Sequence, residues 1–246
     1  MFKPCIVVPV YNHERAVSAV VASLLRHGLP CILVDDGSGA RCAETLDHLA
    51  QATPEQITLL RHHKNLGKGA AVMTGIRYAA AKGFSHVLQI DADGQHSIAD
   101  VPRFLGEAQI RPASVITGYP IYDDSVPAAR LYGRYATHIW VWINTLSLNI
   151  RDSMCGFRVY PVDAIMQLLN QKTLGLRMNF DIEVLVRLYW MGLDVVNLPT
   201  RVAYPSNGIS HFHVWRDNGL LARMHAVLFL GMLCRVPQLL TRKWRE

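Results

Sequence analysis

The hydrophobic positions in the first half of the chain alternate between two patterns. Short apolar runs that end in turn or acidic residues, typical of strands, occupy residues 5–10, 31–36, 57–62 and 86–91. Longer segments with helical spacing of apolar residues lie between them, at 14–26, 40–51 and 69–81. This β-α series predicts an α/β fold with a mainly parallel sheet covered by helices on both faces. We expect the strand order 3-2-1-4, which places two acidic strand ends beside a central crevice.

The second half of the chain is less regular. Its pattern predicts strands at 114–120 and 193–199, and a strand or loop at 155–161. Helices are expected at 128–148, 162–169 and 180–192. We therefore expect one catalytic domain over residues 1–210, followed by a C-terminal helical tail at 211–246.

Composition narrows the class of protein. The 246 residues are 50% hydrophobic and 18% charged, with a net charge of +6, so the chain can bury a large core and suits anionic partners. The five cysteines are scattered without a C-x-x-C pair, which indicates reduced thiols rather than disulfides or a zinc site. The start of the chain predicts a strand and no signal peptide, and no apolar run is long enough to span a bilayer. We expect a cytoplasmic protein, soluble or peripheral to a membrane.

The stretch "VLQIDADGQHS" places two acids at the end of a strand. Asp91 and Asp93 project to the same side if the extended geometry persists, and two like charges repel unless a positive group lies near them. A turn or helix cap is one explanation. The other is a divalent cation, because Mg²⁺ and Mn²⁺ prefer such oxygen ligands and Gln95 can add a neutral one. A second acidic strand end, Asp35-Asp36, favours the cation, and the absence of a P-loop disfavours a P-loop nucleotidase.

Several motifs together resemble a known family. "VVPVYNHE", "LVDDGS", "NLGKGAAVMTGIRYA" and "DADGQH", in this order, resemble the nucleotide-sugar domain of inverting GT-A glycosyltransferases of family 2. "RLYGRYATHIWVWINTLSLNIRDSMCGFRVY" and "FDIEVLVRLYWMG" are similar to the polyprenol-phosphate sugar transferases of the dolichol-phosphate mannosyltransferase type. The resemblance runs from about residue 6 to residue 205 and implies the Rossmann-like GT-A fold.

The resemblance implies roles on the donor side of the site. The residues that would line the nucleoside pocket are Pro9, Tyr11, Asn12 and Glu14. Asp36 would read the base, and Gly67 and Lys68 would lie beside the nucleotide. The residues that would hold Mg²⁺ or Mn²⁺ on the diphosphate are Asp91, Asp93 and Gln95. A cation there would neutralise the charge that grows on the departing nucleoside diphosphate.

On the phosphate and acceptor side, Arg130 and Arg134 match arginines that contact phosphate groups, and their i, i+4 spacing places them on one helix face. Asp152 and Arg158 belong to a D-x-x-x-G-F-R element, in which Arg158 would hold a phosphate or pair with Asp152.

The acceptor-site acids would be Asp181 and Glu183. A hydroxyl acceptor would need one of them as general base, whereas a polyprenyl phosphate is already ionised and would need none. The segment 204–218 departs from the lipid-phosphate enzymes and leaves the acceptor open. Its His211 and His213 would reach the metal or diphosphate, or belong to an ordinary exposed loop.

The tail combines apolar helical positions with the basic end "TRKWRE". This composition suits a helix lying in a membrane interface. Packing on the catalytic domain or on a second copy of the chain is the alternative.

These features predict a metal-dependent inverting glycosyltransferase. It would move a sugar from a UDP- or GDP-sugar to a polyprenyl phosphate or other lipid-type acceptor at the inner membrane surface. One alternative is transfer to a soluble or polysaccharide hydroxyl, and another is a nucleotide-sugar binding module without catalysis. A nucleic-acid partner is not expected, because the chain lacks a basic stripe with interleaved aromatic residues. The residues leave the sugar, the base and a homo-oligomeric state open.

Overall fold

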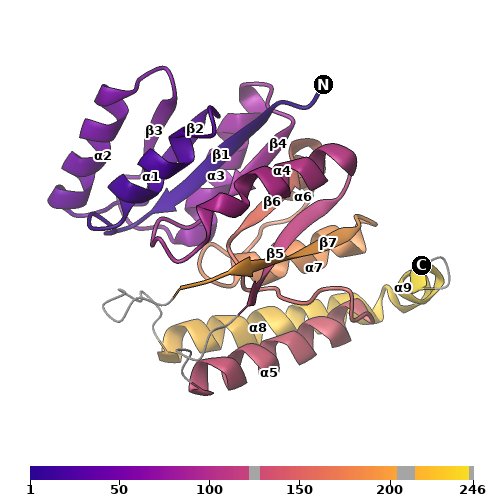
Figure 1. Ribbon diagram of the computed structural model, residues 1–246. Coiled ribbons are helices and arrows are strands. Elements are labelled where there is room, and N and C mark those ends of the chain that lie inside the picture. Colours follow the sequence, from indigo (N-terminus) through magenta and orange to yellow (C-terminus); the bar gives the residue numbers. More distant parts are fainter. Residues whose placement is uncertain (122–127, 204–213, 244–246) are drawn as a thin grey trace.

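A seven-stranded sheet forms the centre of the computed structural model, which describes residues 1–121, 128–203 and 214–243 (Figure 1). The strands lie in the order β3-β2-β1-β4-β6-β5-β7, so the expected order 3-2-1-4 of the first four is confirmed. Their bounds are β1 Pro4–Val10, β2 Cys31–Asp35, β3 Ile57–Arg61, β4 His86–Gln89, β5 Val115–Ile121, β6 Arg158–Pro161 and β7 Val195–Arg201.

The sheet is mainly parallel, as predicted. β1 pairs in parallel with β2 and β4, β2 with β3, and β5 with β7. β6 is the exception, because it runs antiparallel to both β4 and β5. The acidic residues that follow β2 and β4 therefore lie at one edge of the sheet.

Helices cover both faces of the sheet. Their bounds are α1 Val17–Leu25, α2 Ala40–Ala52, α3 Lys68–Ala81, α4 Val101–Ile110, α5 Ala128–Thr145, α6 Val162–Gln171, α7 Phe180–Trp190, α8 Val214–Leu233 and α9 Val236–Lys243, with a short 3-10 helix at Ile98–Asp100. The predicted helix at 14–26 begins only at Val17, because residues 14–16 form a turn. We predicted no helix at 101–110, although Val101, Phe104 and Ala108 form a buried stripe with helical spacing.

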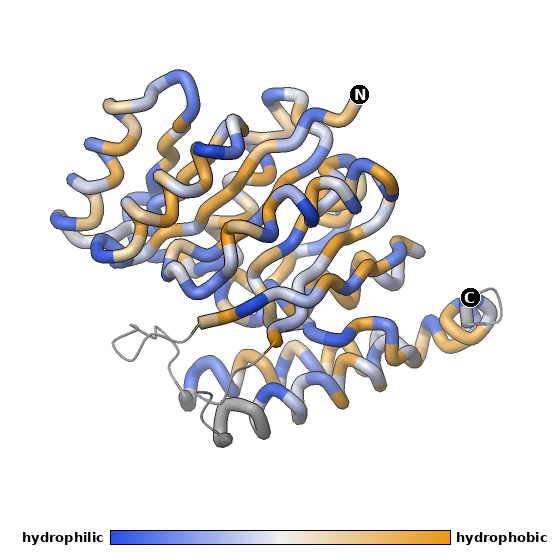
Figure 2. The backbone as a smooth tube through the Cα atoms, in the orientation of Figure 1, coloured by the Kyte–Doolittle hydropathy of each residue, from blue (hydrophilic) through white to orange (hydrophobic). Residues whose placement is uncertain are grey.

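Alternate residues of β1 feed two separate hydrophobic cores. Cys5 and Val7 pack with α3, α6 and α7, whereas Ile6, Val8 and Val10 pack with α1 and α4 on the other face. In Figure 2 the strands are accordingly mostly orange, and the outer helices alternate blue and orange. Gly75 lets α3 approach the sheet closely, since a Cβ there would overlap the Val7 side chain.

Two long helices, α5 and α8, lie side by side along one side of the molecule, away from α1 and α2 (Figure 1). The tail is not detached, because Met224, Leu228 and Met232 of α8 join the core cluster that contains α7. Within the described residues no single helix has the length and apolarity of a membrane span. Only one pair of consecutive helices in the described residues has that length and apolarity when taken together, Arg216–Leu233 and Val236–Arg242, and the pair is bent by 78° at its junction. The expected boundary near residue 210 falls in 204–213, outside the described residues.

Candidate active site

The predicted metal and phosphate residues meet at the carboxyl edge of the sheet. A cavity of about 90 Å³ is lined there by Asp91, Asp93, Gln95, His96 and Arg134, together with Gly156 and neighbouring residues. Asp91 and Asp93 follow β4, Arg134 comes from α5, and Gly156 precedes β6. Segments distant in sequence therefore supply two acids, an amide, an imidazole and a guanidinium group to one small space.

Asp91 is held by a cation of the chain itself. The Lys68 ammonium lies 2.8 Å from Oδ1 and 2.9 Å from Oδ2 of Asp91, and His96 Nε2 lies 3.6 Å from Oδ2. Burial alone would raise the pKa of Asp91, but Lys68 and His96 hold it well below its usual range. Gly156 makes this position possible, because a Cβ on Gly156 would overlap the Asp91 carboxylate.

Asp93 lies in the turn beyond Asp91. Its Oδ1 accepts a hydrogen bond of 2.9 Å from the backbone N–H of Gln95, and Gly94 between them has a φ of 74°. The end of β7 fixes this turn, since the Ala203 N–H donates to the Gln95 carbonyl at 2.9 Å. Asp93 and Gln95 thus face the cavity from a turn that the sheet supports.

The donor set at this edge suits a hard divalent cation. Among residues 1–121, 128–203 and 214–243, no group of three or more His, Cys, Asp or Glu side chains could by itself hold a metal ion. Two carboxylates and an amide are nevertheless oxygen ligands of the kind that Mg²⁺ and Mn²⁺ take, and Mg²⁺ commonly completes its shell with waters and substrate phosphates. Because Lys68 already neutralises Asp91, Asp93 and Gln95 are the better placed ligands. His211 and His213 lie outside the described residues.

Asp36 organises the loop before α3. Its buried carboxylate accepts hydrogen bonds from the N–H groups of Leu66 and Gly67, at 2.9 and 2.8 Å, and lies 2.8 Å from His62 Nδ1. Gly67 has a φ of 111°, a conformation that favours glycine. Both oxygens of Asp36 are bound by protein groups, and its expected role in reading the base stays a prediction.

The remaining predicted nucleoside residues lie along the same edge. Asn12, in the left-handed region with a φ of 55°, accepts a hydrogen bond of 2.8 Å from the Gly39 N–H through its Oδ1. Pro9 is buried opposite Val34 of β2, and Tyr11 and Glu14 are half-buried in the segment after β1. Their contact with a nucleoside stays a prediction.

The second acid pair, Asp181 and Glu183, lies in the first turn of α7 and is 4% and 7% exposed. Asp181 Oδ2 is 2.8 Å from the Lys68 ammonium, and its Oδ1 accepts a hydrogen bond of 2.9 Å from Gln89. Glu183 accepts from the Gly175 N–H at 2.8 Å and pairs with Arg187 at 2.7 Å. Both carboxylates are occupied by protein partners, which favours the alternative in which neither acid acts as a general base.

Arg158 also differs from expectation. Its side chain is fully buried and donates hydrogen bonds to the carbonyl oxygens of Ser153 and Asp181 and to the Tyr160 hydroxyl, which in turn donates to Gln89 at 3.2 Å. It contacts neither the cavity nor Asp152, so neither predicted role for Arg158 fits. Arg158 instead begins a buried polar chain that ends at Asp181.

Asp152 joins α5 to the segment before β6. Arg134 Nη2 donates to it at 2.7 Å, His138 Nε2 lies 3.4 Å away, and the N–H groups of Met154 and Cys155 donate to it at 2.8 Å. Burial would raise the pKa of Asp152, but His138 and Arg134 lower it below its usual value. Asp152 therefore positions Arg134 at the cavity. Arg130 lies in α5, and its side chain is outside the described part of the chain.

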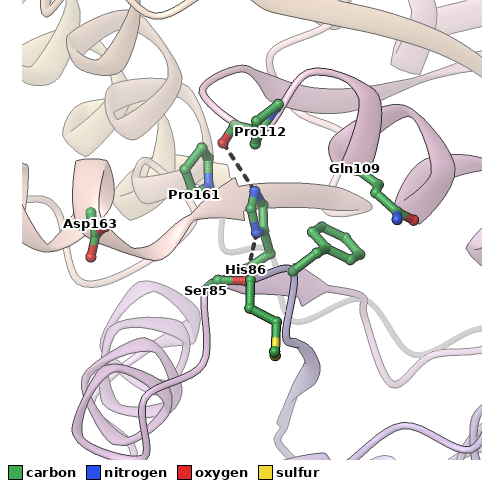
Figure 3. Close-up of a pocket in the computed structure, with 8 residues that line it drawn as sticks. Ser85, His86, Gln109, Pro112, Pro161 and Asp163 are labelled. Carbon is green, nitrogen blue, oxygen red and sulfur yellow. Dashed lines mark hydrogen bonds between the residues drawn. The ribbon is translucent and has the colours of Figure 1, made fainter.

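A larger cavity, of about 390 Å³, lies at the opposite edge of the sheet (Figure 3). Its imidazole, His86, is engaged on both ring nitrogens, by Ser85 Oγ and the Pro112 carbonyl, each at 3.0 Å. This cavity presents no comparable set of acids and cations, so we place the candidate site at the carboxyl edge. There the sequence analysis missed His96, although it directly follows Gln95 in the "DADGQH" motif.

Comparison with known proteins identifies the family of this chain. The profile described as Glycosyl transferase family 2 matches residues 5–168. The chain belongs to glycosyl transferase family 2. It is therefore a glycosyltransferase, as the resemblance of its motifs implied.

Relatives and a solved structure extend this result. The polyprenol monophosphomannose synthase of Mycolicibacterium smegmatis is 23% identical over 219 residues, covering 83% of this chain and 79% of that protein. The undecaprenyl-phosphate mannosyltransferase of Micrococcus luteus is 26% identical over 207 residues, 78% and 80% of the two chains. Glucosyl-3-phosphoglycerate synthase from Mycobacterium tuberculosis, solved with Mn²⁺, UDP-glucose and phosphoglyceric acid, aligns with a TM-score of 0.65 at 16% identity, covering 94% of this chain and 79% of that one. This structural likeness confirms the GT-A-like fold.

Proposed function

We propose that this family 2 glycosyltransferase moves a sugar from a UDP- or GDP-sugar to a polyprenyl phosphate, with inversion and with Mg²⁺ or Mn²⁺. The names of the two mannosyltransferase relatives support a lipid phosphate as acceptor, and the solved complex supports a nucleotide-sugar donor with Mn²⁺. The observation that carries the proposal is the occupied state of Asp181 and Glu183. Without a free carboxylate in the expected base position, the chain suits a nucleophile that is already ionised.

The chemistry then needs little proton transfer. A phosphate monoester has a second pKa of about 6, so its oxygen is anionic at neutral pH. In one in-line displacement this oxygen would form a bond to the anomeric carbon while the bond to the nucleoside diphosphate breaks, and the carbon inverts. A bound cation would stabilise the departing diphosphate as a Lewis acid. Asp93 and Gln95 would hold that cation, and Arg134, fixed by Asp152, would contact a phosphate from the α5 side.

The lipid acceptor is supported by an exposed apolar surface, which we call the α5–α8 face. Trp140 joins the two helices, since its ring lies 5.9 Å from that of His225 and 6.4 Å from that of Phe229. Arg216 and Arg223 on α8 are also exposed. The exposed apolar residues of this face are Tyr135, Ile139, Trp140, Ile143, Val227, Leu230 and Leu233. Apolar helix faces with nearby arginines are typical of proteins that lie on anionic membranes, so we place the protein peripherally on the cytoplasmic membrane surface.

Matched acceptors test the proposal. Purified enzyme is incubated with Mn²⁺, a panel of UDP- and GDP-sugars, and either undecaprenyl phosphate or undecaprenol. We expect transfer to the phosphate at least about a hundredfold faster than to the alcohol, because the alcohol needs a base. Equal transfer to the alcohol, or transfer to a soluble glycan instead, would overturn the proposed acceptor.

Flotation with liposomes tests the membrane surface separately. Wild-type protein should float with vesicles containing anionic phosphatidylglycerol. The double variant that carries Ile139→Asp and Leu230→Asp should stay unbound. Ile110→Asp, which changes an exposed apolar residue of α4, is the control and should float like wild type. Flotation of the double variant at the wild-type level would remove the α5–α8 face from the proposal.

A further inference from the structure

Lys68 lies between two carboxylates that come from different parts of the fold. Its ammonium is 2.8 Å from Asp91 Oδ1 and 2.8 Å from Asp181 Oδ2. Lys68 is the first residue of α3, Asp91 follows β4, and Asp181 is in the first turn of α7. One side chain therefore links the rim of the site to the buried core beneath it.

Asp181 is the fixed end of this link. Its second oxygen accepts the hydrogen bond from Gln89, and its own carbonyl accepts one from Arg158. These partners are buried and do not face the cavity. Asp181 is therefore held by partners from the core, and it holds Lys68 in turn.

Asp91 is the end that needs support. Its neighbour Asp93 has the same charge, and the proposed donor brings a diphosphate to the same space, so an unsupported carboxylate would be repelled. The Lys68 ammonium lies 2.8 Å from an oxygen of each of Asp91 and Asp181, so two opposite charges hold it in place. A permanent positive charge thus lies beside Asp91 before any ligand enters.

We infer that Lys68 is a positioning residue, anchored by Asp181, that fixes the Asp91 carboxylate and leaves Asp93 and Gln95 to bind the cation. This inference rests on the proposed nucleotide-sugar chemistry of the site. It differs from the role implied by the family resemblance, in which Lys68 lies beside the nucleotide as a direct donor ligand.

The two roles predict opposite results for metal binding without donor. Loss of the Lys68 charge frees the Asp91 carboxylate, which lies two residues from Asp93, so Lys68→Met should bind free Mn²⁺ about three- to tenfold more tightly than wild type, a change of about 1 kcal/mol. In the same Lys68→Met variant, kcat/KM should fall about a hundredfold, because the Asp91 carboxylate is no longer held by Lys68. Mn²⁺ affinity is measured by electron paramagnetic resonance, and the folded fraction by circular dichroism.

Three variants complete the experiment. Lys68→Arg keeps the charge and should recover kcat/KM to within about tenfold of wild type. Asp181→Asn should lower kcat/KM on its own but add little loss to Lys68→Met, since both break the same link. Lys82→Met, at the other end of α3, is the control and should match wild type in both measurements.

Unchanged or weaker Mn²⁺ binding by folded Lys68→Met would overturn the inference, and with a raised donor KM it would indicate a direct donor contact. A loss of Mn²⁺ binding and of kcat/KM in proportion to the unfolded fraction would also overturn the inference, because it would indicate that Lys68 has a purely structural role. If Lys68→Met does not fold, additive losses in Lys68→Arg and Asp181→Asn would overturn it as well. Failure of the proposed function would show differently, as a wild-type protein that transfers no sugar.

Discussion

Two pairs of acids with the same spacing in sequence lie in different environments in this fold. Asp91 and Asp93 follow a strand and line a cavity, whereas Asp181 and Glu183 begin a helix and are almost fully buried. The helix pair has its oxygens occupied by Lys68, Gln89, Gly175 and Arg187. The strand pair has one acid held by Lys68 and one that faces the cavity from a turn.

The difference shows that partners, not position in a motif, decide what a carboxylate can do. An acid whose oxygens accept hydrogen bonds from fixed buried donors is a poor proton acceptor and a poor metal ligand. An acid in a supported turn beside open space can take up a cation. We therefore propose that the rim pair takes part in the chemistry and that the helix pair belongs to the frame that holds it.

The largest effect is expected at Asp93. Replacing Asp93 with Ala removes the carboxylate that faces the cavity, and kcat/KM should fall about a thousandfold or more, equivalent to about 4 kcal/mol of transition-state stabilisation. A thermal-shift assay should also lose the Mn²⁺-dependent stabilisation by donor. Glu107→Gln is the control, because Glu107 is a half-buried acid on α4 that lies 3.8 Å from Arg111 and away from the cavity. Wild-type activity in Asp93→Ala would contradict the proposal that the strand pair, unlike the helix pair, takes part in the chemistry.

A smaller loss is expected from Gly156→Ala. The added methyl group would overlap the Asp91 carboxylate and push it from Lys68, so we expect a loss of ten- to about a hundredfold in kcat/KM. Gly106→Ala on α4 has open space around it and should be neutral or slightly stabilising. Steady-state kinetics with both variants measures how far the Asp91 position matters, and full activity in Gly156→Ala would contradict it.

Glu183→Gln gives the sharpest test of the helix pair. The amide keeps the shape but loses the charge opposite Arg187, so unfolding free energy should drop by about 1–3 kcal/mol, while kcat per folded molecule stays within about threefold of wild type. Urea unfolding measures the free energy of unfolding, and steady-state assays normalised to the folded fraction measure kcat. A general base would instead show a loss of about a hundredfold or more in kcat with little change in stability.

The smallest effect lies outside both pairs, at His225 between α5 and α8. Burial lowers the pKa of His225 to about 4, from an ordinary value of 6.5. As the pH falls below 6.5 the unfolded chain takes up this proton first, so the stabilisation is complete above pH 6.5 and is lost towards pH 4. Between pH 7 and 5.5 we expect a loss on the order of 1 kcal/mol in urea unfolding, and none from this source in His225→Gln. An equal loss in both proteins would contradict the assignment and attribute the pH effect to other groups.

The sequence was sufficient for the first four strands of the sheet and for the rim of the site. Alternating apolar runs predicted the first four strands, and acids after β2 and β4 predicted which edge would carry polar chemistry. Periodicity could not show that β6 runs antiparallel, because direction depends on pairing partners distant in sequence. The motifs predicted that Arg158 and Asp181 lie near the site, but they could not predict that both side chains are buried. Their burial depends on contacts between β4, β6 and α7, which are also distant in sequence.

We propose that a divalent cation with the donor diphosphate binds at Asp93 and not at the helix pair. Anomalous diffraction at the manganese edge, from crystals soaked with Mn²⁺ and the preferred nucleotide-sugar, tests it most directly. We expect one strong peak about 2.0–2.3 Å from an Asp93 oxygen, with the diphosphate on its far side and Lys68 still against Asp91. A peak bound by Asp181 or Glu183, or a donor held without any metal at Asp93, would contradict it.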